Sequence, residues 1–279
     1  MTVPNEATAA KAGARSTADE RVLAFRTLFV LLALAAWAAL WAWSASPYSR
    51  YLDHGRWTDA GVLAALCRAV PEGDVVVPAL LHTSAWLLMI AAMMLPTTLP
   101  ILELFRRLVR DRHDRRLLIA ALAAGYAAAW LAFGLAAHAA DWGVHALGAR
   151  VPWLALHGWT IGAAILALAG AFQFSSLKYR CLDKCHSPLG FLMERWQGRR
   201  PVAEAWRLGI DHGAFCVGCC WALMLLMFVV GTGSLGWMLA LAVVMAAEKN
   251  LPQGRRLRTP LGVALLAWAV GIVAWNLAS

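Results

Sequence analysis

The sequence predicts an all-α fold: a polytopic bundle of about seven transmembrane helices, with the N-terminus inside the cell and the C-terminus outside. Apolar residues make up 61% of the 279 residues and charged residues only 15%, a composition unlike that of an ordinary soluble domain. Long apolar windows recur along the chain, and each approaches the roughly 20 residues that cross a ~30 Å hydrocarbon core. Segments rich in Lys and Arg alternate with segments poor in them along the chain, and this alternation predicts the orientation in the membrane.

The elements follow in order. A polar stretch rich in Ala and Thr comes first, so residues 1–20 are expected to be a disordered cytoplasmic tail and residues 21–279 a single transmembrane helical domain. The sixth window is shorter than the others. The predicted spans lie near 27–46, 78–102, 117–140, 153–177, 209–230, 234–247 and 260–277.

The orientation follows from Lys and Arg, which accumulate in cytoplasmic loops. With the N-terminus inside, the cytoplasmic segments hold 21 of the 25 basic residues. These segments are 1–26, 103–116, 178–208 and 248–259. The net charge of +9 is therefore a feature of topology, and no nucleic-acid partner is expected. We predict a multi-pass protein of the bacterial inner (plasma) membrane, with the lipid bilayer as its surroundings.

Cysteine is the residue type that points most directly to chemistry. Five of the six cysteines fall between residues 181 and 220, in two groups that are both placed at the inner side; the sixth, Cys67, is assigned no role. In the second group, His212, Cys216 and Cys219 lie within about 60° of one another on a helix. Thiolate and imidazole bind zinc and Cu(I), and sulfur-rich sites favour Cu(I). The candidate metal ligands are Cys181, Cys185, His186, His212, Cys216, Cys219 and Cys220.

A second set of candidates is weaker, because each has a plain structural explanation. Methionine at helical spacing often only fills a core, and histidine or aspartate at the outer face is tolerated by water. The three methionines lie in the second window, at about the depth in the membrane that is expected for Cys219. The secondary metal-ligand candidates are Met89, Met93, Met94, Asp141, His145 and His157.

Four segments of the chain form a recognisable pattern. They are Trp86-x-x-Met89-x-Ala91-Ala92-Met93-Met94-Leu95-Pro96, Gln173 through Leu177-Lys178-x-x-Cys181-x-x-x-Cys185, Gly209-x-x-His212-Gly213-x-x-Cys216-x-Gly218-Cys219-Cys220-Trp221-Ala222-Leu223-Met224, and Glu248-Lys249. Together these segments resemble a bacterial family of unknown function described as predicted metal-binding integral membrane proteins. The resemblance covers roughly residues 80 to 255, and it implies a metal site at the Cys and His residues without an established reaction. Ser175-Ser176 precede the Leu-Lys pair, where the family pattern has Thr-Pro.

The function expected from these features is an integral membrane protein that binds a soft transition metal, copper before zinc, and serves its transport, insertion or sensing. A metallochaperone or a second copy of the chain is a candidate partner. The first alternative is a membrane thiol or copper oxidoreductase that uses Cys216, Cys219 and Cys220. The second is a structural or assembly subunit without metal. The sequence leans against an enzyme, and the lack of a Walker-type motif argues against ATP-driven pumping by this chain alone.

Overall fold

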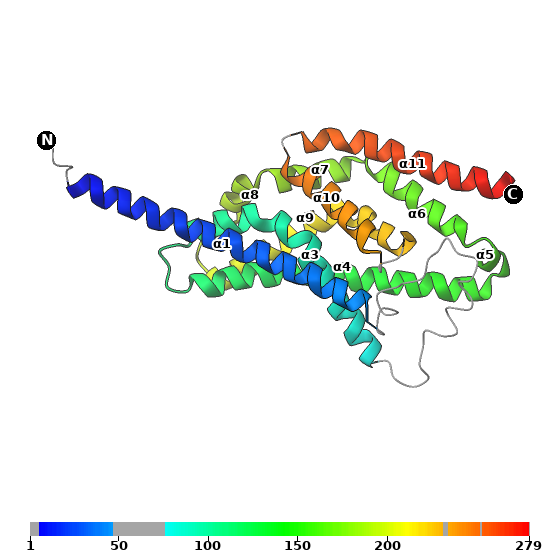
Figure 1. Ribbon diagram of the computed structural model, residues 1–279, viewed down its shortest axis with the longest axis horizontal. Helices are drawn as coiled ribbons and strands as arrows, with labels where there is room; N and C mark the ends of the chain where they lie inside the picture. Colours follow the sequence, from blue (N-terminus) through cyan, green and yellow to red (C-terminus); the bar gives the residue numbers. More distant parts are fainter. Residues whose placement is uncertain (1–5, 47–75, 231–233, 252, 279) are drawn as a thin grey trace.

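The computed structural model describes residues 6–46, 76–230, 234–251 and 253–278, and all regular structure in these ranges is α-helical. The all-α prediction is thereby confirmed. Most of the helices lie roughly along one common direction, side by side (Figure 1). They are α1 (Glu6–Ser44), α3 (Val76–Leu108), α4 (Arg115–Arg150), α5 (Pro152–Leu156), α6 (Trp159–Phe172), α7 (Ser176–His186), α8 (Pro188–Arg195), α9 (Pro201–Val230), α10 (Leu235–Asn250) and α11 (Gly254–Ala278).

Five helices in the described ranges are long and apolar enough to cross a membrane, and a sixth span results if α6 and α7 are taken together. The count of seven is not confirmed, for two reasons. The fourth predicted span is divided among shorter helices, and α10 has only 16 residues, fewer than the roughly 20 that a perpendicular span needs. The five segments are Leu23–Ser44, Thr83–Leu108, Arg115–Gly148, Pro201–Val229 and Gly254–Ala278.

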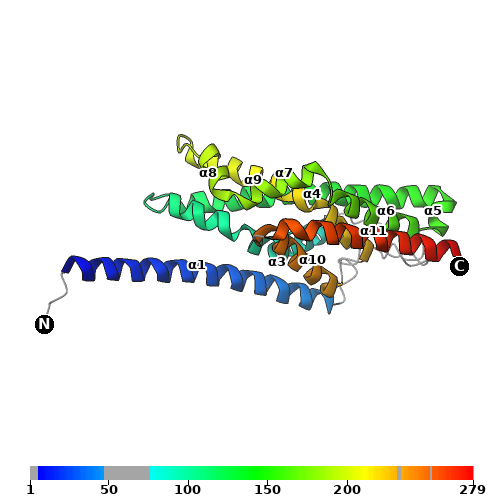
Figure 2. The same cartoon turned by 90° about the horizontal axis from the view of Figure 1, so that it is seen from above.

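Helix α1 runs along one side of the bundle and projects beyond it at its N-terminal end (Figures 1 and 2). It begins at Glu6, so the helix includes most of the segment expected to be a disordered tail. Arg26 joins α1 to α3 through the carboxylate of Glu103, with Nε–Oε1 and Nη2–Oε2 distances of 2.5 and 3.0 Å. This two-point geometry fixes both the distance and the orientation of the pair.

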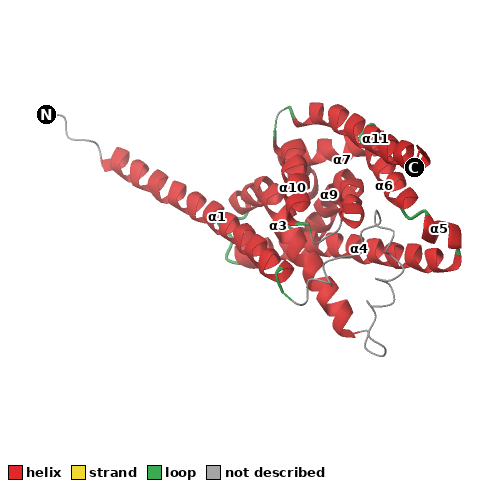
Figure 3. Cartoon of the chain, turned by 45° about the vertical axis from the view of Figure 1, so that its right-hand side comes forward, coloured by secondary structure: helices red, strands yellow, loops and turns green. Residues whose placement is uncertain are grey.

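Helix α9 lies in the middle of the bundle, with α3, α4 and α10 around it (Figure 3). Glycines allow α4 and α9 to approach at backbone distance. A Cβ atom at Gly209 would lie 2.1 Å from the carbonyl oxygen of Leu122, and one at Gly125 would lie 2.2 Å from that of Trp206. Neither atom can move aside, because both belong to the backbone. Glycine at both helix surfaces is thus the condition for this contact.

The junction between α6 and α7 bends the chain by 61°. Ser175 starts the new helix: its backbone is extended, and its side-chain oxygen accepts a hydrogen bond from the backbone N–H of Lys178 at 3.1 Å. A serine in this position satisfies one of the free N–H groups of a helix start. Because of the bend, α7 lies against α9 and carries its two cysteines to it.

Candidate metal centre

The two cysteine groups of the sequence come together where α7 packs on α9. Cys181 is buried, and a Cβ atom at position 218 would lie 2.6 Å from its sulfur, so the contact requires Gly218. One turn further along α7, the half-buried Cys185 interacts with the thiol of Cys219. The sulfur atoms of α7 therefore face those of α9 across the helix contact.

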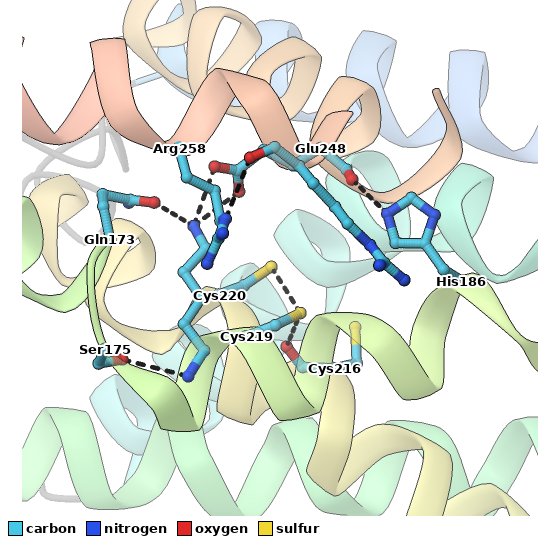
Figure 4. Close-up of polar contacts among 10 residues, drawn as sticks. Gln173, Ser175, His186, Cys216, Cys219, Cys220, Glu248 and Arg258 are labelled. Carbon is cyan, nitrogen blue, oxygen red and sulfur yellow. Dashed lines mark hydrogen bonds and ion pairs between the residues drawn. The ribbon is translucent and has the colours of Figure 1, made fainter. Parts of the chain in front are cut away.

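Three cysteines of α9 form the buried centre of this region (Figure 4). Cys216, Cys219 and Cys220 are each only 1% exposed. The sulfurs of Cys219 and Cys220 are 3.4 Å apart, and the Cys219 thiol donates to the backbone carbonyl of Cys216 at 3.1 Å. The region is buried and sulfur-rich, which suits a soft metal ion or thiol chemistry.

An ammonium group lies directly beside these sulfurs. Lys249, near the end of α10, is buried and places Nζ 2.7 Å from the sulfur of Cys216. The same nitrogen is 3.7 Å from the sulfur of Met94 and 3.5 Å from the hydroxyl of Thr97, both on α3. The hydroxyl of Tyr126 lies 3.0 Å from the Cys216 sulfur on another side. A buried ammonium needs a partner that offsets its lost hydration, and Cys216 is the contacting group that is able to carry negative charge.

A second buried charge occupies the neighbouring position of α10. The carboxylate of Glu248 accepts from Nζ of Lys178 at 2.7 and 3.0 Å, and the two side chains are 1% and 0% exposed. The side-chain oxygen of Gln173 accepts a further hydrogen bond from the same ammonium (Figure 4). This ion pair connects the bend between α6 and α7 to α10. The adjacent residues Glu248 and Lys249 of α10 therefore contact two separate places, the bend and the sulfur of Cys216.

The two histidines predicted as ligands are engaged elsewhere. His186 points to α10, where its Nε2 donates to the backbone carbonyl of Glu248 at 2.9 Å (Figure 4). His212 is buried one turn before Cys216, with its ring 5.8 Å from that of Tyr126 and 5.7 Å from that of Phe191. A hydrogen bond to α10 thus accounts for the position of His186, and aromatic packing accounts for that of His212.

The methionines among the secondary candidates share a core with the cysteines. Met89, Met93 and Met94 are at most 4% exposed and pack in the same cluster as Cys216. Four further methionines, none of them among the predicted ligands, belong to this cluster. They are Met224, Met227, Met238 and Met245.

The outer candidates are less closely associated. Asp141 and His145 lie one turn apart on α4, and the side chain of His145 is outside the described part of the structure. His157 follows α5, where its ring stacks on Trp153 with centroids 4.6 Å apart and its Nδ1 lies 2.8 Å from the carbonyl oxygen of Trp153. This local contact with Trp153 accounts for the position of His157.

The donor atoms of this region determine which kind of metal ion it could hold. Within the described ranges, no group of three or more His, Cys, Asp or Glu side chains is gathered closely enough to hold a metal ion. A structural zinc site, which takes four such ligands, is therefore not preformed there. The sulfur donors of the cysteines and of Met94 are of the soft kind that Cu(I) prefers, so the type of the donors, rather than a preformed geometry, points to that ion.

Fold and site together define an all-helical, apolar protein with a sulfur-rich interior beside a buried lysine. The sequence model of the PpoB2 family, described as a copper chaperone, matches residues 83–272. The chain belongs to this family. None of the curated proteins and none of the solved structures in the comparisons matches it significantly. The match confirms the expectation of a metal-related family and links the chain to copper; it gives no support to zinc.

Proposed function

We propose that this protein is an integral membrane copper chaperone that holds Cu(I) at the sulfur group of α7 and α9 and delivers it to an acceptor. The observation that carries the proposal is the convergence of two sequence-distant cysteine groups at Gly218, in a buried region beside methionine. The copper chaperone family supports the identity of the metal. A second copy of the chain or an acceptor protein is the proposed partner.

The proposed ligands are the two thiolates of Cys216 and Cys219, with Cys220 beside them as a neutral thiol and Cys181 and Cys185 receiving or releasing the ion at the edge. More sulfurs are present than a low-coordinate ion needs, so exchange between neighbouring sulfurs provides a route through the site. Met94 extends this route to α3, because its sulfur shares the lysine contact with Cys216, and the proposal includes Met89 and Met93 further along that helix. We assign His186 and His212 a place around the ligands rather than among the first to bind.

The distribution of basic residues supports a place in the bacterial inner membrane with the N-terminus inside. In this orientation the connection from α7 to α9, which contains Arg199 and Arg200, faces the cytoplasm. Thiols stay reduced in that compartment, as the binding of Cu(I) by cysteine requires. Copper therefore enters the site from the cytoplasmic side in this proposal.

Metal analysis of the purified protein tests the proposal. Protein purified in detergent without oxygen, and loaded from a buffered Cu(I) solution, should hold about one copper ion per chain. Cys216→Ser and Cys219→Ser should lower this content strongly, because serine keeps the volume but removes the soft ligand. Cys67→Ser is the matched control, since Cys67 belongs to neither group and lies outside the described residues. Equal copper content in all three variants and the parent would refute the proposal.

One observation favours a second candidate, a thiol oxidoreductase. Cys185 on α7 interacts with the thiol of Cys219 on α9, so a disulfide between the two helices is the oxidation that this arrangement favours. Cys219 and Cys220 have sulfurs 3.4 Å apart, but they are consecutive residues, and a disulfide between them would require α9 to distort. Alkylation of free thiols before and after mild oxidation distinguishes the two functions. The oxidoreductase requires reversible loss of two reactive thiols in metal-free protein, whereas the chaperone requires protection of these thiols by Cu(I).

A further inference from the structure

We propose that Lys249 makes the sulfur site selective for a monovalent metal ion, because its buried ammonium balances the charge of Cu(I) held by two thiolates. The inference rests on the proposed function and adds the residue that determines which ion is accepted. Lys249 itself binds no metal in this proposal. It acts through its charge, at hydrogen-bond distance from a ligand.

The ammonium of Lys249 lies close enough to the sulfur of Cys216 to balance its negative charge. Nζ of Lys249 is 2.7 Å from the sulfur of Cys216, in a region removed from water. The residue before Lys249 is Glu248, and its carboxylate is already paired with Lys178 at 2.7 Å. The charge of Lys249 is therefore left for the sulfur group, and the charge of Lys178 is not.

Neighbouring groups also keep the ammonium of Lys249 in place when a metal ion binds the sulfur of Cys216. The hydroxyl of Thr97 donates its proton to the carbonyl of Met94 at 2.8 Å, so its oxygen lone pairs are free for Nζ at 3.5 Å. The Met94 sulfur lies at 3.7 Å. These neutral groups hold the ammonium beside the site without cancelling its charge.

The charge balance gives the selectivity. Two thiolates with Cu(I) carry one net negative charge, and the ammonium makes the assembly neutral. Two thiolates with Zn²⁺ are already neutral, and the ammonium then leaves one uncompensated positive charge. An unbalanced buried charge is strongly unfavourable because little solvent screens it. The lysine therefore favours Cu(I) and its soft analogue Ag(I), and it disfavours divalent ions. Binding displaces the proton of the second thiol.

Metal competition on the purified, reduced full-length protein tests this inference. Ag(I) and Zn²⁺ are titrated separately into the parent protein and into Lys249→Met, Lys249→Gln and Lys249→Arg, and both affinities are measured. The ratio of Ag(I) to Zn²⁺ affinity should fall by roughly tenfold to a hundredfold in the two neutral variants. Lys249→Arg should keep most of the ratio, since arginine retains the charge.

The control and the outcomes separate this inference from the proposed function. Arg110→Met removes one positive charge from a side chain that is 76% exposed, and it should leave the ratio unchanged. If the parent protein binds neither Ag(I) nor Cu(I), the proposed function itself fails. If the parent binds Ag(I) and the folded neutral variant, Met or Gln, keeps the parent's ratio, only the role of Lys249 is refuted.

Discussion

Among substitutions that change only one side-chain group, the one that breaks the ion pair between Lys178 and Glu248 should lower the free energy of unfolding most. Glu248→Gln keeps the size of the side chain and removes its charge, which leaves the Lys178 ammonium buried with amide partners only. The two side chains are 0% and 1% exposed, so solvent cannot replace the lost partner. Breaking one side of a fully buried pair typically costs about 3–5 kcal/mol. For a chain of this size, that corresponds to a drop in melting temperature of about 6–20 °C.

Thermal unfolding in detergent, followed by circular dichroism or intrinsic Trp fluorescence, measures this loss. Glu194→Gln is the matched control, because it makes the same chemical change at a carboxylate that is 61% exposed and pairs with Lys184 at 3.6 Å and with Arg195 at 3.2 Å. Such pairs contribute only about 0–1 kcal/mol. The double change Lys178→Met with Glu248→Leu should regain most of the stability, since it leaves no charge behind. Equal melting temperatures for Glu248→Gln and Glu194→Gln would refute the reasoning.

Two further predictions concern packing and topology. Gly209→Ala should destabilise the bundle by about 1–3 kcal/mol in the same unfolding assay, because the new Cβ atom meets the backbone of α4. Gly271→Ala on α11 is the control, and it should be neutral or slightly stabilising because the space around Gly271 is open. Reporter fusions after Arg116 and Arg200 should be active as cytoplasmic markers, and one after Arg150 as an external marker; an external result at Arg200 would reverse the proposed entry side of copper.

Long apolar windows predict the helical class well, because one feature, the length of an apolar run, determines it. The window 153–177 shows where this fails. Its average hydropathy is that of one span, yet the chain bends at Gln173–Ser175 and α7 starts from the Ser175 cap. A short local break of this kind changes the average hydropathy little. The only signal in the sequence is a pair of serines, which also occurs in unbroken helices.

The candidate site is predictable to the extent that it lies on one helix. Helical periodicity places Cys216 and Cys219 on one face, and both are buried on α9. Tyr126 and Lys249 were not predicted to belong to the site, and they reach the Cys216 sulfur from positions 90 and 33 residues away. No local pattern links such distant positions. The usable signal was the pair of charges at the end of α10, for which interfacial exposure is the ordinary expectation.

Burial of those two charges is what gives α10 its significance. A helix turns by about 100° per residue, so the consecutive side chains of Glu248 and Lys249 point in different directions and reach different helices. One is fixed to Lys178 at the α6–α7 bend, and the other contacts Cys216 on α9. Ionisable groups within an apolar bundle are costly and are usually retained for a function. The ion pair of Glu248 with Lys178 therefore fixes the end of α10 from which Lys249 reaches Cys216.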